Sequence, residues 1–558
     1  MQKTAGELEI IDERSHAAKR GIYLLAAIVA VCALTFFFGA GRLALTGPDE
    51  PRYAEVAREM FVTGDYITPR LAGCVWFEKP VLVYWMAAAS YRLFGVGEFA
   101  ARFPSATSAF IACLALYFGM RRSTSREWAA ASSLALATTG LFIGFARSIT
   151  MDMALASAIA LALISGYKAT ESERRARLLY WAGCGAATAL GCLAKGFVAI
   201  LLVGAIMGLY LLVAGRLRRI GLRELMIAAA AIVAVAGSWY VPVTLRHGDL
   251  FIDEFIIEHH FQRYITPIHN HPQPAYFYLF VIFAGLMPWT FLLVPAVSRI
   301  RTLRPREDCM DTLLVFAWIW LAVPLLFFSF SSSKLPGYIV PVFPALAIIV
   351  GAELERIWNG YRAGLSRAAL WITALLLLAI GIAFILYLES QDVATEGWQL
   401  LIRFTPLALG ILAFIMLLRS QARRFLFAAG GVVILVVVGS VVVLLPRLSE
   451  TLSHKNLSLE AASQLRPGEK MGLFIMKEFA PVFYGEGRMV CGTGDGTLMN
   501  ALHPDRLVSV LERESSIIVL TEKRWVERLE EDERLSLEMI GEQRKAVALR
   551  VSLRSVSP

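Results

Sequence analysis

The sequence predicts an α-helical membrane protein with about 13 transmembrane helices and a small C-terminal α/β domain. Of its 558 residues, 57% are hydrophobic and only 18% are charged, a balance that excludes a soluble domain of this size. Apolar stretches of about 17 to 25 residues recur through the first 445 positions, each long enough to cross a bilayer core. Arg-rich clusters separate many of them, so the net charge of +9 indicates topology and not nucleic-acid binding.

The basic clusters orient the predicted helices, because Lys and Arg are retained in cytoplasmic loops. Residues 1–21 are then cytoplasmic, residues 22–445 form the transmembrane region, and the odd number of spans places residues 446–558 on the opposite side, the periplasm of a Gram-negative cell. The main outer loops are residues 44–101 and 245–275. The expected spans are 22–43, 102–120, 128–147, 149–168, 179–195, 197–214, 224–244, 276–298, 311–330, 336–352, 368–388, 403–418 and 426–445.

One apolar run, Pro80 to Phe94, is short for a bilayer and would invert the charge pattern if it crossed, so we expect a juxtamembrane or re-entrant helix on the outer face. In the tail, Met471–Ile475, Ile517–Leu520 and Val547–Val551 have the pattern of strands, and Trp525–Glu531 that of a helix. This pattern predicts a small α/β domain.

The seven cysteines show no C-x-x-C spacing, and most lie inside apolar segments. A Cys74–Cys491 bridge is the one conceivable pairing, and the lack of a disulfide framework argues against it.

The segment after the first helix, Gly47 to Tyr53, carries Asp49, Glu50 and Arg52. Acidic residues at a helix start are common on dipole grounds, so an ordinary N-terminal cap competes with a functional interpretation. Farther along the same loop, Glu78 precedes Lys79. Lys79 is either an interfacial lysine that reaches toward water or a ligand for a phosphate.

Ionisable residues at membrane depth are costly and are therefore functional candidates. Arg147 and Asp152 lie between two apolar segments with almost no loop, and a structural ion pair between them is the competing explanation. Lys195, at the next outer turn, presents the same choice. Lys334 and Tyr338 add a cation and an aromatic ring to the same side.

The second large outer loop is rich in histidine: five of the eight histidines lie between positions 247 and 271. Its His259 and His260, with Glu78, are candidate ligands for zinc or another divalent metal. Because no fixed H-E-x-x-H motif is present, roles in hydrogen bonding or substrate orientation are favoured, and no cofactor is expected to be required. Arg263 adds a cation to this loop.

Carboxylates, isolated cations and apolar walls on one face suit an anionic amphiphile with a sugar head and a lipid tail. The motifs resemble the membrane glycosyltransferases of the C-type (GT-C) fold, in the branch shared by protein O-mannosyltransferases and bacterial lipid A aminoarabinose transferases. The resemblance covers roughly residues 22–352. It is carried by Asp49-Glu50, Glu78-Lys79-Pro80, Arg102 after Glu98, Thr150-Met151-Asp152, Leu193-Ala194-Lys195-Gly196, and Glu258-His259 with Arg263.

The resemblance implies a monomeric enzyme of the inner membrane that transfers 4-amino-4-deoxy-L-arabinose from undecaprenyl phosphate to a lipid A phosphate, with resistance to polymyxin as the outcome. It implies Asp49 and Asp152 as catalytic carboxylates and Lys79 as ligand of the donor phosphate. Its implied substrate-binding residues also include Glu50, Arg52, Tyr53, Arg147, Lys195, Arg263, Lys334 and Tyr338.

Three alternatives remain. One is a structural assembly protein, which would leave Asp49, Lys79 and Asp152 without a reason to lie together. A protein O-mannosyltransferase would use the Asp49 carboxylate as a true base. A flippase or transporter for a lipid-linked sugar would show internal repeats and broken helices near the midplane, and the sequence has no such repeat.

Overall fold

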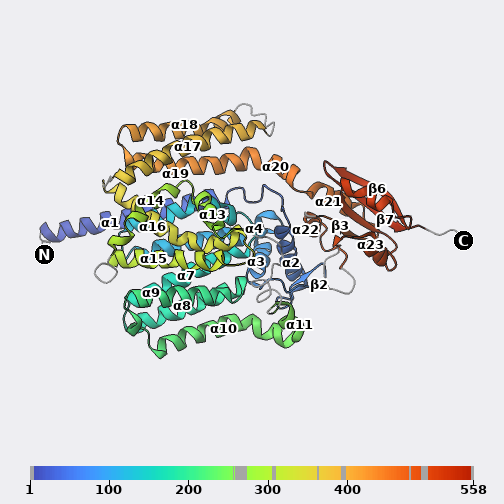
Figure 1. Ribbon diagram of the computed structural model, residues 1–558, viewed down its shortest axis with the longest axis horizontal. Helices are drawn as coiled ribbons and strands as arrows, with labels where there is room; N and C mark the ends of the chain where they lie inside the picture. Colours follow the sequence, from blue (N-terminus) through green and yellow to red (C-terminus); the bar gives the residue numbers. More distant parts are fainter. Residues whose placement is uncertain are drawn as a thin grey trace.

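The computed structural model describes residues 5–255, 257, 273–303, 309–360, 364–390, 398–476, 479–491 and 500–554. Long helices run side by side along the longest axis of the molecule, and a small sheet domain lies beyond one end of them (Figure 1). The N-terminus lies at the opposite end. The long helices are α1 Ala5–Cys32, α4 Glu98–Met120, α7 Met151–Glu171, α8 Arg174–Lys195, α9 Val198–Val213, α10 Leu222–His247, α15 Cys309–Ser329, α16 Phe343–Trp358, α17 Gly364–Ser390, α18 Trp398–Leu418 and α19 Ala422–Gly439.

Nine helices in the described ranges are long and apolar enough to cross a membrane, or up to 11 if each of two bent pairs is one span. The bent pairs are α5 Arg126–Ala137 with α6 Gly140–Ala146, and α13 Phe277–Gly285 with the segment Thr290–Thr302, which contains α14 Leu293–Ser298. Helices α8 and α9 occupy the other two expected positions. Helix α9 does not meet the same criteria because it has only 16 residues, and α8 does not meet them either. The chain is a multi-pass membrane protein.

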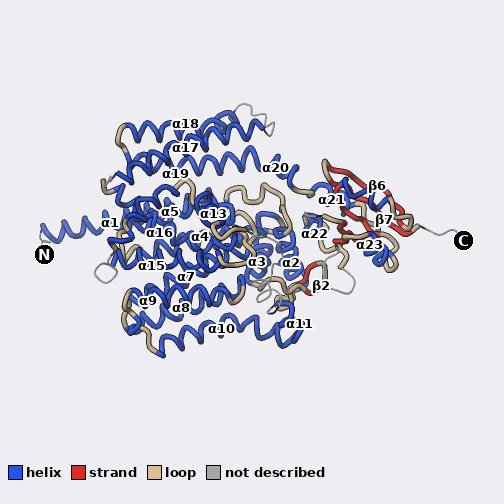
Figure 2. The backbone as a smooth tube through the Cα atoms, in the orientation of Figure 1, coloured by secondary structure: helices blue, strands red, loops and turns tan. Residues whose placement is uncertain are grey.

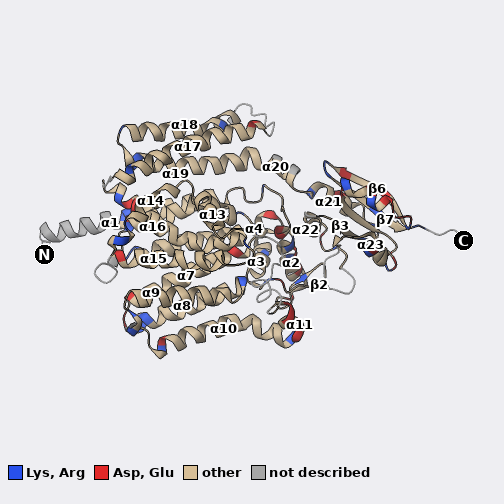
Figure 3. Ribbon diagram, viewed as in Figure 1, with Lys and Arg blue, Asp and Glu red and all other residues tan. Residues whose placement is uncertain are grey.

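The bundle has a buried centre and a peripheral layer. In the most apolar window of Pro336–Trp358, which contains α16, 94% of residues are buried, against 17% in Leu222–His247. Small residues allow close packing at the centre, as where Gly351 of α16 lies so near Ser132 of α5 that any larger side chain would overlap it. Lysine and arginine gather at the helix ends nearest the N-terminus (Figure 3), as expected for the cytoplasmic side.

Two short helices and a small hairpin form a layer at the other end of the bundle. They are α2 Asp49–Thr63, the antiparallel pair β1 Arg70–Leu71 and β2 Cys74–Val75, and α3 Leu82–Phe94. Helix α3 has 13 residues and packs against α2 and α4, so this run is a separate short helix, and its placement relative to the membrane stays a prediction. The layer is held together by Glu59 of α2, which accepts a hydrogen bond from the backbone of Gly73 in the hairpin.

Apart from that hairpin, the described strands lie in the C-terminal region (Figure 2). They form one five-stranded mixed sheet in the order β4-β3-β5-β7-β6. The three expected strands are β3 Lys470–Phe474, β5 Ile517–Glu522 and β7 Ala546–Leu553, and the expected helix is α24 Val526–Glu530. The analysis missed β6 Leu535–Gln543, whose side chains are largely exposed and interspersed with charge, and the two-residue β4 Asn500–Ala501. The remaining helices are α20 Leu445–Leu452, α21 Lys455–Ser463, α22 Ala480–Tyr484 and α23 Pro504–Leu511.

A disulfide joins the hairpin to this sheet domain. Cys74 of β2 and Cys491 are bonded, with their Cα atoms 6.0 Å apart and 417 positions apart in the chain. The argument against a bridge was therefore wrong, because cysteine spacing carries no information about two segments that only tertiary packing brings together. Since such bonds persist in oxidising compartments, the disulfide supports an extracytoplasmic position for this end of the molecule.

Candidate active site

The first cluster of candidate residues lies at the start of α2, and we call Asp49, Arg52, Glu78 and Lys79 the α2 cluster. Asp49 lies in the first turn, where the helix dipole favours a carboxylate. Arg52, one turn later, donates from Nη2 to Asp49 Oδ1 at 2.6 Å, and its Nη1 lies 3.5 Å from Glu78 Oε2. Lys79 Nζ donates to Glu78 Oε1 at 2.7 Å. The side chain of Asp49 is 58% exposed, so its carboxylate is accessible to a ligand.

The carboxylates of the α2 cluster shift the pKa values of Arg52 and of the neighbouring Tyr53. Burial lowers the pKa of the Arg52 guanidinium, but the carboxylates of Glu78 and Asp49 outweigh this effect and raise it. Burial, together with Glu78 and Asp49, raises the pKa of Tyr53 well above its ordinary value. Tyr53 is therefore a neutral phenol, and its ring packs against that of Tyr84, with centroids 6.2 Å apart.

Glu50 points into the protein and forms a buried ion pair with Arg102 of α4. Arg102 Nε and Nη2 donate to Glu50 Oε1 and Oε2 at 3.0 and 2.8 Å. Arg102 also donates to the carbonyl oxygens of Ala40, Leu43 and Ala44, in the segment between the first helix and α2. Glu50 in turn accepts a hydrogen bond from the backbone N–H of Ile149 at 3.0 Å. The pair thus connects the start of α2 with α4 and with the turn before α7.

The second cluster lies around Asp152 in the first turn of α7. Thr150 caps this helix, because its hydroxyl accepts a hydrogen bond from the backbone N–H of Asp152 at 3.2 Å. Lys195, the last residue of α8, forms an ion pair with Asp152, and its Nζ lies 4.3 Å from the centroid of the Tyr338 ring. A Cβ at Gly337 would lie 2.5 Å from Asp152 Oδ2, so glycine permits this close approach.

Arg147 and Asp152 do not form the structural ion pair that was the alternative to a functional role for them. Asp152 pairs with Lys195, whereas Arg147 Nη1 donates to the carbonyl oxygens of Thr35 and Phe38 at 3.2 and 2.9 Å. Among the described side chains, the structural Arg147–Asp152 ion pair is therefore absent. Arg147 instead fastens the turn before α7 to the end of the first helix.

Lys334 is buried and donates to the carbonyl oxygens of Ser331 and Gln273 at 2.7 and 3.0 Å. Through these hydrogen bonds, Lys334 connects its own turn to the segment before α13. The ring of Tyr338 faces Lys195 and also packs against Phe328.

The metal prediction rests partly on residues outside the described ranges, which include His259, His260 and also Arg263. Within those ranges, no group of three or more His, Cys, Asp or Glu side chains is arranged to hold a metal ion. Glu78 already faces two cations, Lys79 and Arg52, with which a metal would compete. Metal binding through Glu78 and the histidines stays a prediction.

Sequence reasoning missed three aromatic residues around the α2 cluster. Trp76 and Phe479 both face the Arg52 guanidinium, and Tyr84 packs on Tyr53. No motif marks them. The sequence did indicate that Arg102 has a partner, because an arginine inside an apolar helix requires one, but it did not indicate which residue that partner is.

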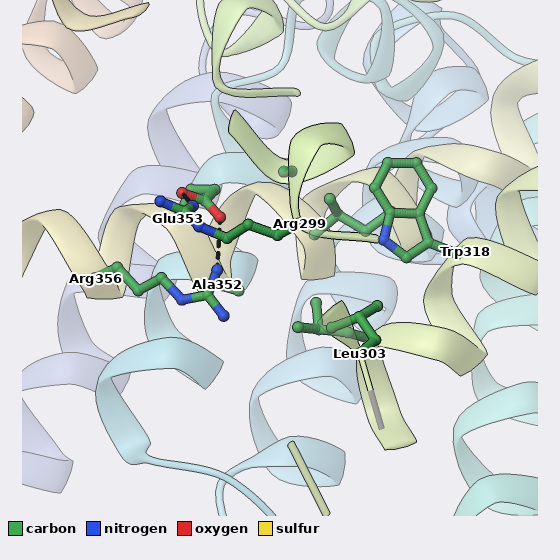
Figure 4. Close-up of a pocket in the computed structure, with 9 residues that line it drawn as sticks. Arg299, Leu303, Trp318, Ala352, Glu353 and Arg356 are labelled. Carbon is green, nitrogen blue, oxygen red and sulfur yellow. Dashed lines mark hydrogen bonds and ion pairs between the residues drawn. The ribbon is translucent and has the colours of Figure 1, made fainter. Parts of the chain in front are cut away.

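One pocket lies at the opposite, Lys- and Arg-rich end of the bundle (Figures 3 and 4). Glu353 of α16, almost fully buried, forms ion pairs with Arg299 and Arg356, and Trp318 lines the other side. The two partly exposed guanidinium groups compensate the buried carboxylate, and the pocket shares no residue with either candidate cluster.

The fold defines a class of protein, the polytopic membrane proteins of the GT-C fold. The chain shares its fold with ArnT from Cupriavidus metallidurans bound to undecaprenyl phosphate, with a TM-score of 0.77 at 24% identity, over 94% of this chain and 97% of that one. Residues 78–241 match the family described as dolichyl-phosphate-mannose-protein mannosyltransferase.

Among curated proteins, the chain is similar to the undecaprenyl phosphate-alpha-4-amino-4-deoxy-L-arabinose arabinosyl transferases. It is 30% identical to that of Aeromonas salmonicida (strain A449) over 62% of this chain, and 32% identical to that of Pseudomonas aeruginosa (strain UCBPP-PA14) over 63%. The matches span 63% and 64% of these relatives, less than two thirds of their length. The resemblance to GT-C membrane glycosyltransferases of the O-mannosyltransferase-like group is thereby confirmed.

Proposed function

We propose that the chain is a glycosyltransferase that moves 4-amino-4-deoxy-L-arabinose from undecaprenyl phosphate to a phosphate of lipid A, on the periplasmic face of the inner membrane. The observation that carries the proposal is the α2 cluster, which holds an accessible carboxylate, Asp49, in the same set of ion pairs as Lys79. The similar proteins of Aeromonas salmonicida and Pseudomonas aeruginosa are named for the sugar and its undecaprenyl phosphate carrier, which supports the donor part of the proposal. The outcome for the cell is resistance to polymyxin and other cationic peptides.

The acceptor determines what the carboxylates must do. A lipid A phosphate is already an anion near neutral pH, so the attacking oxygen needs no general base. Asp49 and Asp152 would instead orient the sugar, whose amino group is a cation, and stabilise the positive charge that develops at the anomeric carbon. Lys195 pairs with Asp152 and orients that carboxylate.

Lys79 supports departure of the donor phosphate. As the bond between the anomeric carbon and undecaprenyl phosphate breaks, its electron pair stays on the phosphate oxygen, and an ammonium nearby stabilises that charge. An oxygen of the lipid A phosphate forms the new bond to the anomeric carbon. A single displacement inverts this centre, and mass-spectrometric detection of a glycosyl-Asp49 adduct would contradict it.

The test is mass spectrometry of lipid A from cells that lack the protein and make the aminoarabinose donor, complemented with the intact chain or with Asp49→Asn. We expect a pentosamine mass increment with the intact chain and none with the variant. Unmodified lipid A with the intact chain would refute the proposal. Altered glycoproteins in its place would favour a protein O-mannosyltransferase, which the match of residues 78–241 also supports.

A further inference from the structure

A side chain from the C-terminal sheet domain contacts the α2 cluster. The Arg52 guanidinium carbon lies 5.2 Å from the centroid of the Phe479 ring and 5.6 Å from that of Trp76. Phe479 immediately precedes α22, and its backbone N–H donates to the carbonyl oxygen of Gly47 at 3.5 Å. The domain therefore contacts both the chain that leads into α2 and the arginine that bridges Asp49 and Glu78.

The docking of this domain is built from specific buried groups. Tyr484, at the end of α22, accepts a hydrogen bond from the backbone N–H of Leu45 at 2.9 Å and donates to Glu98 Oε1 of α4 at 3.1 Å. Lys455 of α21 forms an ion pair with the same carboxylate. In Figure 1, α22 lies between α2 and the sheet. These contacts fasten the domain to the segment just before Asp49.

A second attachment lies on the other side of the α2 cluster. The disulfide from Cys491 reaches Cys74, four residues before Glu78. The loop with Glu78 and Lys79 is thus covalently tied to the domain whose Phe479 faces Arg52. The sheet domain therefore holds the α2 cluster at two places, one covalent and one aromatic.

We propose that the C-terminal domain is a working part of the donor site and that Phe479 is its positioning residue. This inference rests on the proposed function and assigns a role to a domain without a catalytic motif. The electron-rich ring faces attract the guanidinium and restrict a long side chain that otherwise has many rotamers. With its rotamers restricted in this way, Arg52 keeps the carboxylates of Asp49 and Glu78 at a fixed separation. Glu78 in turn positions the ammonium group of Lys79.

The test compares three variants of the full-length protein in lipid nanodiscs. Phe479→Leu keeps an apolar side chain without the aromatic face, Phe479→Tyr keeps the ring, and Leu502→Ala alters an exposed residue of the same domain as a control. Sugar transfer from the undecaprenyl-phosphate donor is measured together with hydrogen–deuterium exchange of residues 44–55. Migration on non-reducing gels reports the Cys74–Cys491 bond and hence a docked domain.

With the bond intact, we expect Phe479→Leu to lower transfer about 5- to 30-fold, the factor that corresponds to a cation–π contact of a mostly buried guanidinium, and to speed exchange at the start of α2. Phe479→Tyr and Leu502→Ala should match the wild type. Wild-type transfer or wild-type exchange in Phe479→Leu overturns the proposal. If the wild-type protein itself transfers no sugar, the proposed function fails, and the exchange measurement still decides whether Phe479 positions the segment.

Discussion

The ion pair between Glu50 and Arg102 yields the most direct test of how the site is held. Arg102 is 1% exposed, and its guanidinium donates to both oxygens of Glu50 and to three backbone carbonyls. Arg102→Met removes all of these donors and keeps an apolar side chain. The carboxylate of Glu50 then stays buried, with backbone N–H groups from Thr46 and Ile149 as its remaining donors.

The expected loss in the free energy of unfolding follows from the buried Glu50 carboxylate, which Arg102→Met leaves without its cation. Removal of one partner of a buried ion pair costs about 3 to 5 kcal/mol. Removal of both charges, in Glu50→Gln with Arg102→Met, costs less than the sum of the single changes, because neither charge is then left alone. We therefore expect a coupling free energy of about 2 kcal/mol or more in the double-mutant cycle.

The assay is reversible unfolding of the detergent-solubilised protein in a denaturant titration, with sugar transfer measured on the same samples. Transfer should fall together with stability, since the pair connects Asp49 with the turn before Asp152. Arg92→Met is the matched control, because Arg92 is exposed on α3, and it should change the free energy of unfolding by less than about 0.5 kcal/mol. Single changes in Glu50 and Arg102 that add without coupling would refute the reasoning.

Three further predictions concern the same end of the molecule. Lys79→Met should raise the KM for the donor about 10- to 150-fold through loss of charge-assisted hydrogen bonds to phosphate, whereas Lys545→Met, at an exposed position, should not; steady-state kinetics decide. Serine in place of Cys74 and Cys491 should destabilise docking by about 2 to 4 kcal/mol, seen as faster proteolysis of the C-terminal domain; unchanged cleavage would contradict a structural role. Burial raises the pKa of Glu55 from 4.5 to about 7, so its contribution to stability should be complete below about pH 4.5 and lost as pH rises through about 7. Glu55→Gln should flatten this dependence in thermal unfolding between pH 5 and 8, and an equal slope in both proteins would show that another group titrates.

Several parts of the fold follow from local pattern. Each expected span coincides with a helix or a bent helix pair, because hydrophobic length is a property of consecutive residues. The strands β3, β5 and β7 were found for the same reason, since each is mainly buried and apolar, although β7 contains Arg550. Strand β6 was not, because its pairing with β7 outweighs a polar sequence.

The candidate residues were recognisable from the sequence, but most of their partners were not. Composition and spacing by themselves determined a many-span membrane protein and singled out its ionisable candidate residues, and they predicted its orientation. This was possible because the cost of burying a charge in a bilayer and the charge bias of loops act on each segment separately. The tertiary structure alone decided that Asp152 pairs with Lys195, that Glu50 pairs with Arg102, and that the C-terminal domain reaches the α2 cluster through Phe479 and a disulfide. These contacts join residues far apart in the chain, and helix packing, which no local pattern encodes, brings them together.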